Sequence, residues 1–464
     1  MASDTKISRV LLGGWLIVLT LATSAYAQWN EQVLYSFQGG TDGSTPIGAV
    51  AFDQQGNLYG ATRSGGSASC LGPFGCGTVL ELSPAQNGDS WTETILHVFQ
   101  GSAFGDGAAP LGGLVMDSAG NLYGTTGYDG NGQCALFGSV VGCGTVYEVS
   151  PPQQPGGAWT EKVIYNLQGG TDGYSPQGDL VFDKAGNLYG ATLFGGGRGT
   201  NCNILYGGNC GTIFELSPPK TKGGAWTEKV LHSFSSAGLW SVFGDGAEPN
   251  GGLILDDQGN LYGTTYFGGY ALGHCNGGVG GTGCGTVFML ARPEGAGEWS
   301  EAVLHNFLGD PDGAGPLAGV VADQTGNLYG TTYGGGDSAQ GTAFQLMRPG
   351  NSNQLWTENV LYRWSGLNGV LPSGPVLIDP RDGHLYVTAA GGGTSSGGTL
   401  SKLQDPAGEG WTDIVLYDFI GGGTNPAHPD SKLVFRSDAL YSTSLWGGTG
   451  SCQGGCGTVY KIWP

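Results

Sequence analysis

The sequence predicts an all-β fold, a seven-bladed β-propeller of four-stranded antiparallel blades whose ring is closed by the N-terminal strand. Three observations predict it: a segment like residues 251–269 recurs seven times, the first six units each hold four strand patterns and the seventh holds three, and one further strand stands alone near the N-terminus. The Leu-Tyr core of the copies is centred on Leu58, Leu122, Leu188, Leu261, Leu328, Leu385 and Leu440. The spacing of 55 to 73 residues between these leucines is enough for one four-stranded sheet per unit.

The first 27 residues have the pattern of a secretory signal. Lys6 and Arg9 precede an apolar run over residues 10–22, and Ala25-Tyr26-Ala27 is typical of a cleavage site. The alternative is an uncleaved anchor, but the run is shorter than the ~20 residues that a spanning helix needs. We therefore expect a signal peptide over 1–27 and a single propeller domain over 28–464, secreted to the extracellular space or the periplasm.

Three strands of each unit follow from local patterns, as in unit three. An apolar run at residues 180–183 lacks clean alternation, which predicts a strand buried on both faces. An Asp-x-x-Gly-Asn turn follows at 183–187, and residues 188–192 form the second strand of this hairpin. Residues 211–216 are the third strand, which Ser-Pro ends.

The fourth strand of unit three is expected over residues 226–234. By period two, one of its faces should carry Trp226, Glu228, Val230, His232 and Phe234.

The two ends of the chain indicate how the ring closes. The seventh unit ends at residues 457–464 without a fourth strand, while residues 29–37 have the fourth-strand pattern and precede the first unit. The N-terminal strand should therefore complete the last blade. An open solenoid is the alternative, but it would need capping units at both ends.

Three sequence elements, Gly-Asn-Leu-Tyr-Gly-Thr-Thr, Gly-Thr-Val-Phe and Trp-Thr-Glu, recur through the mature chain. In these elements the chain resembles the GloVer tandem-repeat family of bacterial exported proteins. Units six and seven depart from the pattern at residues 383–387 and 438–442. The resemblance implies export and carries over no catalytic residue.

All ten cysteines lie in loops between second and third strands, two to a loop. The pairs are Cys70 and Cys76, Cys134 and Cys143, Cys202 and Cys210, Cys275 and Cys284, and Cys452 and Cys456. An even count in an exported chain favours disulfides, and confinement of each pair to one loop favours five local bridges. Metal ligation is the alternative.

A formal net charge of −20 disfavours nucleic acid and anionic membranes as partners. The charge keeps an exported protein soluble; the alternative is that some carboxylates gather cations. An Asp-Gly turn connects successive units, and its aspartates are weak calcium candidates because they lack the spacing of an EF-hand. They are Asp42, Asp106, Asp172, Asp245 and Asp312. No other cofactor and no membrane span in the mature chain are expected.

Few residues suggest catalysis. His97, His232 and His305 share a fourth-strand position with tyrosines, which indicates a structural role, and His274, His384 and His428 are scattered singles. The starts of the first strands should line the channel, where Asp179 and Lys432 are the ionisable candidates. Propeller enzymes need converging acid–base groups or a metal. We therefore predict no catalytic residue.

Aromatic residues just after the second strands are the candidates for ligand binding. They are Tyr128, Phe194, Tyr266, Phe267, Tyr333 and Trp446. They flank the variable loops on the face that also carries the Asp-Gly turns, and such a face suits sugars or extended peptides. Packing of the rings under their own loops is the alternative. We expect a monomeric binding or scaffold propeller that recognises a polysaccharide, peptide or protein; a carbohydrate-active or lyase-type enzyme is the alternative.

Overall fold

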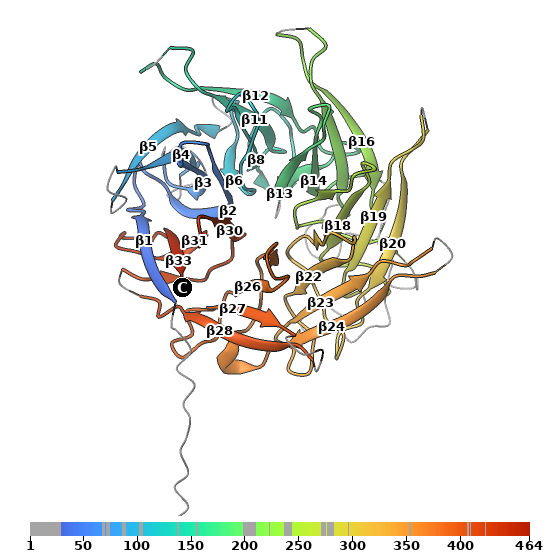
Figure 1. The fold of residues 1–464 in the computed structure, drawn as a ribbon. Coiled ribbons are helices and arrows are strands. Elements are labelled where there is room, and N and C mark those ends of the chain that lie inside the picture. The colour runs from blue at the N-terminus through green and yellow to red at the C-terminus, as the bar shows by residue number, and fades with distance from the viewer. Residues whose placement is uncertain are drawn as a thin grey trace, which may run out of the picture.

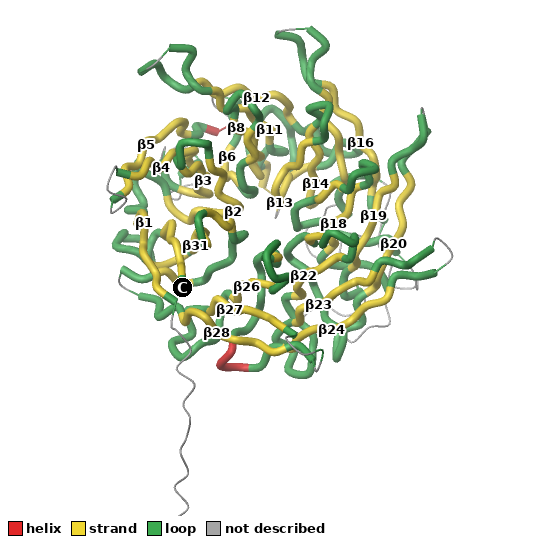
Figure 2. Tube along the Cα trace, viewed as in Figure 1, coloured by secondary structure: helices red, strands yellow, loops and turns green. Residues whose placement is uncertain are grey.

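The computed structural model confirms the propeller (Figure 1). It describes residues 29–464 except 67–69, 71–74, 86–89, 102–104, 137–138, 155, 198–209, 222, 236–243, 271–274, 276–282, 296, 352–353, 406–407, 409 and 423. The predicted signal peptide therefore lies outside the described residues. Seven blades are arranged radially, with the first strands towards the axis and the fourth strands at the periphery (Figures 1 and 2).

The blades follow one another along the chain. Blades 1 and 2 contain β2 (Ser44–Phe52), β3 (Leu58–Ser64), β4 (Thr78–Pro84), β5 (Trp91–Val98), β6 (Ala108–Pro110), β7 (Val115–Met116), β8 (Leu122–Tyr128), β11 (Thr145–Ser150) and β12 (Thr160–Asn166). A small hairpin of β9 (Ala135–Leu136) and β10 (Ser139–Val140) lies in the loop between β8 and β11. Blades 3 and 4 contain β13 (Tyr174–Phe182), β14 (Leu188–Phe194), β15 (Thr212–Ser217), β16 (Thr227–Ser233), β17 (Ile254–Leu255), β18 (Leu261–Thr265), β19 (Thr286–Ala291) and β20 (Ser300–Asn306).

The remaining blades have the same order. Blades 5 and 6 contain β21 (Val321–Ala322), β22 (Leu328–Thr332), β23 (Thr342–Met347), β24 (Thr357–Arg363), the 3₁₀ turn η3 (Gly366–Asn368), β25 (Leu377–Ile378), β26 (Leu385–Ala389), β27 (Thr399–Gln404) and β28 (Thr412–Asp418). Blade 7 contains β30 (Val434–Arg436), β31 (Ala439–Ser444), β33 (Thr458–Trp463) and β1 (Asn30–Ser36), with the pair β29 (Pro426–Ala427) and β32 (Trp446–Gly447) beside it.

The N-terminal strand closes the ring as predicted. β1 pairs antiparallel with β33, from Asn30 opposite Trp463 to Ser36 opposite Thr458. The side chains of Leu34 and Phe37 are buried in the core between blades 7 and 1. The last blade is thus completed by the first strand of the described chain.

The Asp-x-x-Gly-Asn-Leu-Tyr motif forms the turn between first and second strands. In blade 3, Oδ1 of Asp183 accepts hydrogen bonds from the backbone N–H groups of Ala185 and Asn187, at 2.8 and 2.9 Å. Its Oδ2 accepts from Asn187 Nδ2 at 2.8 Å and from the Tyr189 hydroxyl at 3.1 Å. One carboxylate therefore fixes the turn and the start of the next strand.

A bulge in each fourth strand changes the predicted pattern. In blade 3, Val230 pairs with Phe214 and His232 with Ile213, so that Leu231 has no partner in the ladder. Val230 and His232 therefore face opposite sides, and the prediction that one face carries all five side chains is wrong. Leu231 packs into the core between blades 3 and 4 instead. Because of the bulge, one strand can contact both neighbouring blades.

The first strands also differ from the prediction. Leu180 is buried, but Val181 and Phe182 are only half-buried, so this run is not covered on both faces.

Tryptophans next to the start of the fourth strands join five of the blades to the preceding one. Their rings lie 5.9–6.3 Å from the Leu-Tyr tyrosine of that blade, a normal distance for aromatic pairs. The pairs are Tyr59 with Trp159, Tyr123 with Trp226, Tyr189 with Trp299, Tyr262 with Trp356, and Tyr386 with Trp29.

The Cys-Gly-Thr motif joins five of the blades to the following one, and Gln340 and Gly397 take the place of the cysteine in blades 5 and 6. In blade 3 the carbonyl of Cys210 accepts a hydrogen bond from the backbone N–H of Glu248 at 2.8 Å. Gly211 lies against Pro249, whose Cδ would be 2.7 Å from a Cβ added to this glycine. The Thr212 hydroxyl bonds that of Thr192 within the blade, at 2.8 Å. Three adjacent residues thus have three separate structural roles.

Four of the five predicted disulfides are confirmed, each within one loop. They are Cys70–Cys76, Cys134–Cys143, Cys275–Cys284 and Cys452–Cys456. Cys210 is also disulfide-bonded, but its predicted partner Cys202 lies outside the described residues. Within the described ranges, no helix has the length and apolar content that a membrane crossing requires.

Candidate functional site

Three of the predicted aromatic residues line one cleft between blades 4 and 5. Tyr266, Phe267 and Tyr333 surround a cavity of about 230 Å³, together with Ala339, Leu371 and the Cys275–Cys284 disulfide. The rings of Tyr266 and Phe267 meet edge to face, with centroids 4.4 Å apart. The cleft is therefore mainly apolar, and a disulfide cross-links one of its walls.

The position of Tyr266 depends on a glycine of the next blade. A Cβ added to Gly315 would lie 2.7 Å from Cε2 of Tyr266, so the ring rests on the bare backbone there. The backbone N–H of Tyr333 donates to the Gly315 carbonyl at 3.0 Å, which brings the second tyrosine to the same place.

Glu248 adds a carboxyl group beside these tyrosines. Burial raises the pKa of Glu248 to about 7. Burial also raises the pKa of the Tyr266 hydroxyl, and the nearby Tyr333 and Glu248 increase it further. Glu248 has a positive φ of 57°, which is uncommon for a residue other than glycine. Its backbone makes the interblade hydrogen bond to Cys210, and that bond offsets the strain.

Glu248 occupies a position that recurs in all seven units, immediately before a proline. The residues there have φ values of 55–63°: Thr45, Ala109, Ser175, Glu248, Gly315, Leu371 and His428. Each donates its backbone N–H to the preceding blade at 2.7–2.9 Å. The backbone of this position is therefore fixed by the architecture, while its side chain varies from blade to blade.

The other three aromatic candidates lie outside the cleft. Phe194 is buried and packs against Tyr174 next to the Cys134–Cys143 bridge, as the packing alternative describes. Tyr128 is half-buried at the end of β8. Trp446 in blade 7 is 46% exposed, and its ring lies 4.0 Å from that of His428.

The pair of His428 and Trp446 lies close to a partly buried acid, Asp430, that the sequence interpretation missed. Asp430 accepts a hydrogen bond from the Ser373 hydroxyl at 2.5 Å. Burial raises the pKa of Asp430, although Ser373 and His428 partly oppose this effect.

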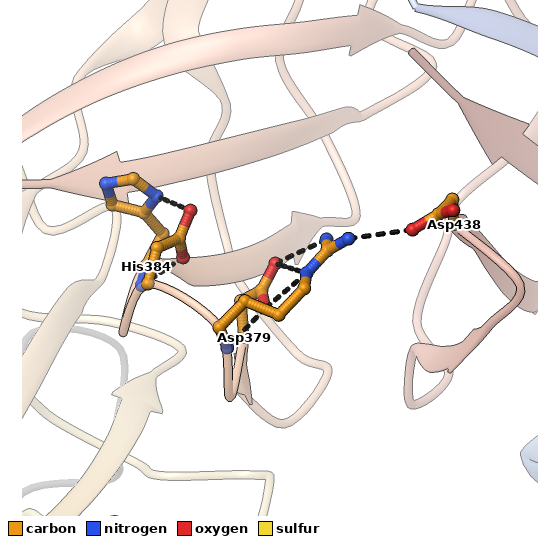
Figure 3. A network of polar contacts seen from close by, with 5 residues as sticks. Asp379, His384 and Asp438 are labelled. Carbon is orange, nitrogen blue, oxygen red and sulfur yellow. Dashed lines mark hydrogen bonds and ion pairs between the residues drawn. The ribbon is translucent and has the colours of Figure 1, made fainter.

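The channel candidates and the scattered histidines do not form one site. Asp179 accepts a hydrogen bond from the Gly113 N–H at 2.7 Å, and no ion pair joins it to Lys432 in the described part of the chain. His384 lies in the turn between β25 and β26, where its Nδ1 pairs with Asp382 (Figure 3). His274 lies outside the described residues.

Next to His384, Arg381 links two blades. It bonds Asp379 of blade 6 at 2.8 Å and Asp438 of blade 7 at 2.8 Å (Figure 3). Both aspartates belong to the units that depart from the repeat pattern. These two ion pairs therefore occur where the turns differ from those of the other blades.

The five aspartates that are weak calcium candidates accept hydrogen bonds within their own turns. Each lies at a different blade boundary. Asp172, for example, accepts hydrogen bonds from the Tyr165 hydroxyl at 3.2 Å and the Gln168 N–H at 2.6 Å. His97, His232 and His305 occupy the tyrosine position and bond their aspartates through Nε2 at 3.0–3.3 Å. These contacts explain the shared histidine–tyrosine position.

A glutamate from the next blade reaches the same boundaries. Burial raises the pKa of four of these carboxyl groups to about 7: Glu93, Glu161, Glu228 and Glu301. The aspartate of each boundary lies nearby, close enough to raise the pKa further. The Trp-Thr-Glu glutamates are therefore protonated in mild acid in the folded protein.

We expect the protein to be more stable near pH 5 than near pH 8. Between an unfolded pKa of 4.5 and a folded pKa of about 7, the folded chain binds more protons than the unfolded chain. The free energy of unfolding therefore falls as the pH rises through this window. Calorimetry should show a melting temperature about 5 °C higher at the lower pH.

Replacing Glu93 and Glu228 with glutamine should reduce this difference, whereas Glu294→Gln, at an exposed position, should leave it unchanged. A melting temperature that rises steadily from about pH 5 to about pH 8 would contradict the assignment.

Comparison with known proteins identifies the family of this repeat. A family model described as the Gloeobacter/Verrucomicrobia repeat matches residues 133–374, more than half of the chain. The chain belongs to this family. The match covers the whole cleft between blades 4 and 5, so the cleft is built on the family's own repeat. A search among curated proteins finds no match.

Among solved structures, this Gloeobacter/Verrucomicrobia repeat protein is similar to several propellers at low identity. A 6-phosphogluconolactonase candidate from Bacteroides uniformis is 14% identical, with a TM-score of 0.45, over 80% of this chain and 86% of that chain. The PQQ domain of pyranose dehydrogenase from Coprinopsis cinerea is 11% identical, with a TM-score of 0.40, over 94% and 97%. A gluconolactonase from Xanthomonas campestris is 14% identical, with a TM-score of 0.37, over 94% and 89%.

Proposed function

We propose that this repeat protein is a secreted, monomeric, non-catalytic binding propeller that recognises a polysaccharide, peptide or protein at its loop-bearing face. The cleft of Tyr266, Phe267 and Tyr333 between blades 4 and 5 carries the proposal. Aromatic rings offer large contact areas at low entropic cost, and Glu248 beside them can bond a hydroxyl or a basic group.

The size of the cleft favours a polymeric ligand. A volume of about 230 Å³ is below the ~300–1,000 Å³ of pockets that enclose a whole small molecule. One sugar ring or one side chain of a longer ligand would enter the cleft, while the rest crosses the surrounding loops. The disulfide in the wall keeps this opening formed before the ligand arrives, which lowers the ordering cost of binding.

Catalysis would require ionisable groups that converge on one bound substrate. Asp179 and His384 instead bond partners in separate blades. This distribution favours binding over the alternative of a carbohydrate-active or lyase-type enzyme. The four bridges suit an oxidising compartment and support export.

Replacing both Tyr266 and Tyr333 with alanine should weaken ligand binding about 10-fold or more, because aromatic contacts dominate such sites. Glycan and peptide arrays would first identify a ligand for the wild-type protein, and titration would then compare the variants. Tyr128→Ala is the matched control, since Tyr128 lies at the end of the second strand of blade 2, outside the cleft. Equal binding by the double variant and the wild type, with both folded, would refute the proposal.

A further inference from the structure

We propose that His305, Asp312 and Glu358 bind one divalent transition-metal ion, such as zinc, at the boundary between blades 4 and 5. This inference does not depend on the proposed ligand-binding function. The three side chains come from separate segments: His305 from β20 of blade 4, Asp312 from the connection between the blades, and Glu358 from β24 of blade 5.

The potential ligand atoms already lie close together. Nε2 of His305 is 3.3 Å from Oδ2 of Asp312, and one donor atom from each of the three residues lies within 4.8 Å of the others. The side chains of His305 and Asp312 are 19% and 13% exposed, so an ion could enter from solvent and still be largely enclosed. In the described part of the chain, no other three histidine, cysteine, aspartate or glutamate residues bring their potential ligand atoms this close together.

The donor set suits a borderline divalent ion. One imidazole nitrogen and two carboxyl oxygens are ligand types that zinc binds, and water could occupy the fourth position of a tetrahedral site. Tetrahedral bonds of about 2.0 Å place neighbouring ligand atoms about 3.3 Å apart, which the His305–Asp312 pair already matches. Oε1 of Glu358 is buried without a hydrogen-bond partner, so it is available as a ligand.

The repeat supplies internal comparisons for this site. His97 and His232 bond equivalent aspartates, but those aspartates lie 9 and 13 residues further along the chain, against 7 for His305. The three His–Asp distances are similar, at 3.2, 3.0 and 3.3 Å. The blade 4–5 boundary differs because a carboxyl oxygen of Glu358 also lies within 4.8 Å of both partners. Where the spacing is also 7, as in Tyr35 to Asp42, a tyrosine replaces the nitrogen ligand. Only the blade 4–5 boundary combines histidine with the short connection in the described chain.

The ion would have a structural effect on the binding cleft. Asp312 lies three residues before Gly315, on which the ring of Tyr266 rests. A metal that joins Asp312 to strands of both blades would therefore hold this connection in place at the edge of the cleft.

The test uses the full exported protein without an affinity tag, stripped of metal with a chelator. Titration with Co²⁺, followed by its visible absorption, and with Zn²⁺, followed by calorimetry, should show one equivalent bound and a higher melting temperature. His305→Tyr, which introduces the residue that other blades carry, and Glu358→Gln should weaken binding about 100-fold. His232→Tyr is the matched control at another boundary and should bind like the wild type.

Three results would overturn the proposal. The first is that the wild-type protein shows no saturable binding of Co²⁺ or Zn²⁺, the second is that the folded His305→Tyr and Glu358→Gln variants bind as well as the wild type, and the third is that His232→Tyr loses as much metal affinity as His305→Tyr. Three bound equivalents would also contradict a site specific to this boundary. Preference for Ca²⁺ or Mg²⁺ over Zn²⁺ would exclude the imidazole as a ligand, because these ions favour oxygen donors.

Discussion

Deleting residues 28–38 should open the ring and destabilise the protein by more than about 5 kcal/mol, because truncating one large core side chain already costs about 2–5 kcal/mol. The deletion removes two such side chains, Leu34 and Phe37, which are 7% and 0% exposed. It also leaves β33 as an unpaired edge and removes Trp29 from its contact with Tyr386. The loss is comparable with the whole stability of many domains.

Denaturant unfolding of the deletion variant and the wild type would measure this loss. A synthetic peptide of residues 28–38, added in trans, should restore the missing strand and part of the stability, as in other cases of strand addition. The control peptide carries alanine in place of Leu34 and Phe37 and should have little effect. Unchanged unfolding after the deletion would show that β1 does not close the ring.

Gly112→Ala should destabilise the protein by about 3 kcal/mol or more, because extra volume in a packed region that cannot shift is costly. An added Cβ would lie 2.2 Å from the backbone oxygen of Gly178 in the next blade. Other glycines near the axis approach their neighbours as closely; a Cβ on Gly48 would lie 2.1 Å from the Gly113 nitrogen. The first strands of adjacent blades thus meet backbone to backbone, which explains the scarcity of side chains predicted for the channel.

Gly40→Ala is the matched control for this prediction. Gly40 is exposed, and an added Cβ would have nothing within 4 Å. Its effect should stay within about 0.5 kcal/mol, as for other exposed positions. Thermal unfolding would compare the stability of the two variants. Equal stability would show that packing of the blades does not require close backbone approach at the axis.

The sequence by itself determined the repeat, the strand order and the closure of the ring. These features follow from local patterns, such as the turn fixed by Asp183 and the missing fourth strand after Trp463. Four disulfides followed for the same reason, because each bridge joins cysteines of one loop. Because the units share a sequence pattern, they also share a conformation. A correct assignment of strands in one unit therefore applies to the other six.

Only the tertiary structure decided which side chains meet between blades. The bulge at Leu231 turns His232 towards the next blade, and strict alternation cannot reveal such an inserted residue. The tyrosines of the cleft and the group of His305, Asp312 and Glu358 come from different units. Their meeting depends on how adjacent blades pack, and this packing brings together residues such as His305 and Glu358, 53 positions apart, that no local pattern relates.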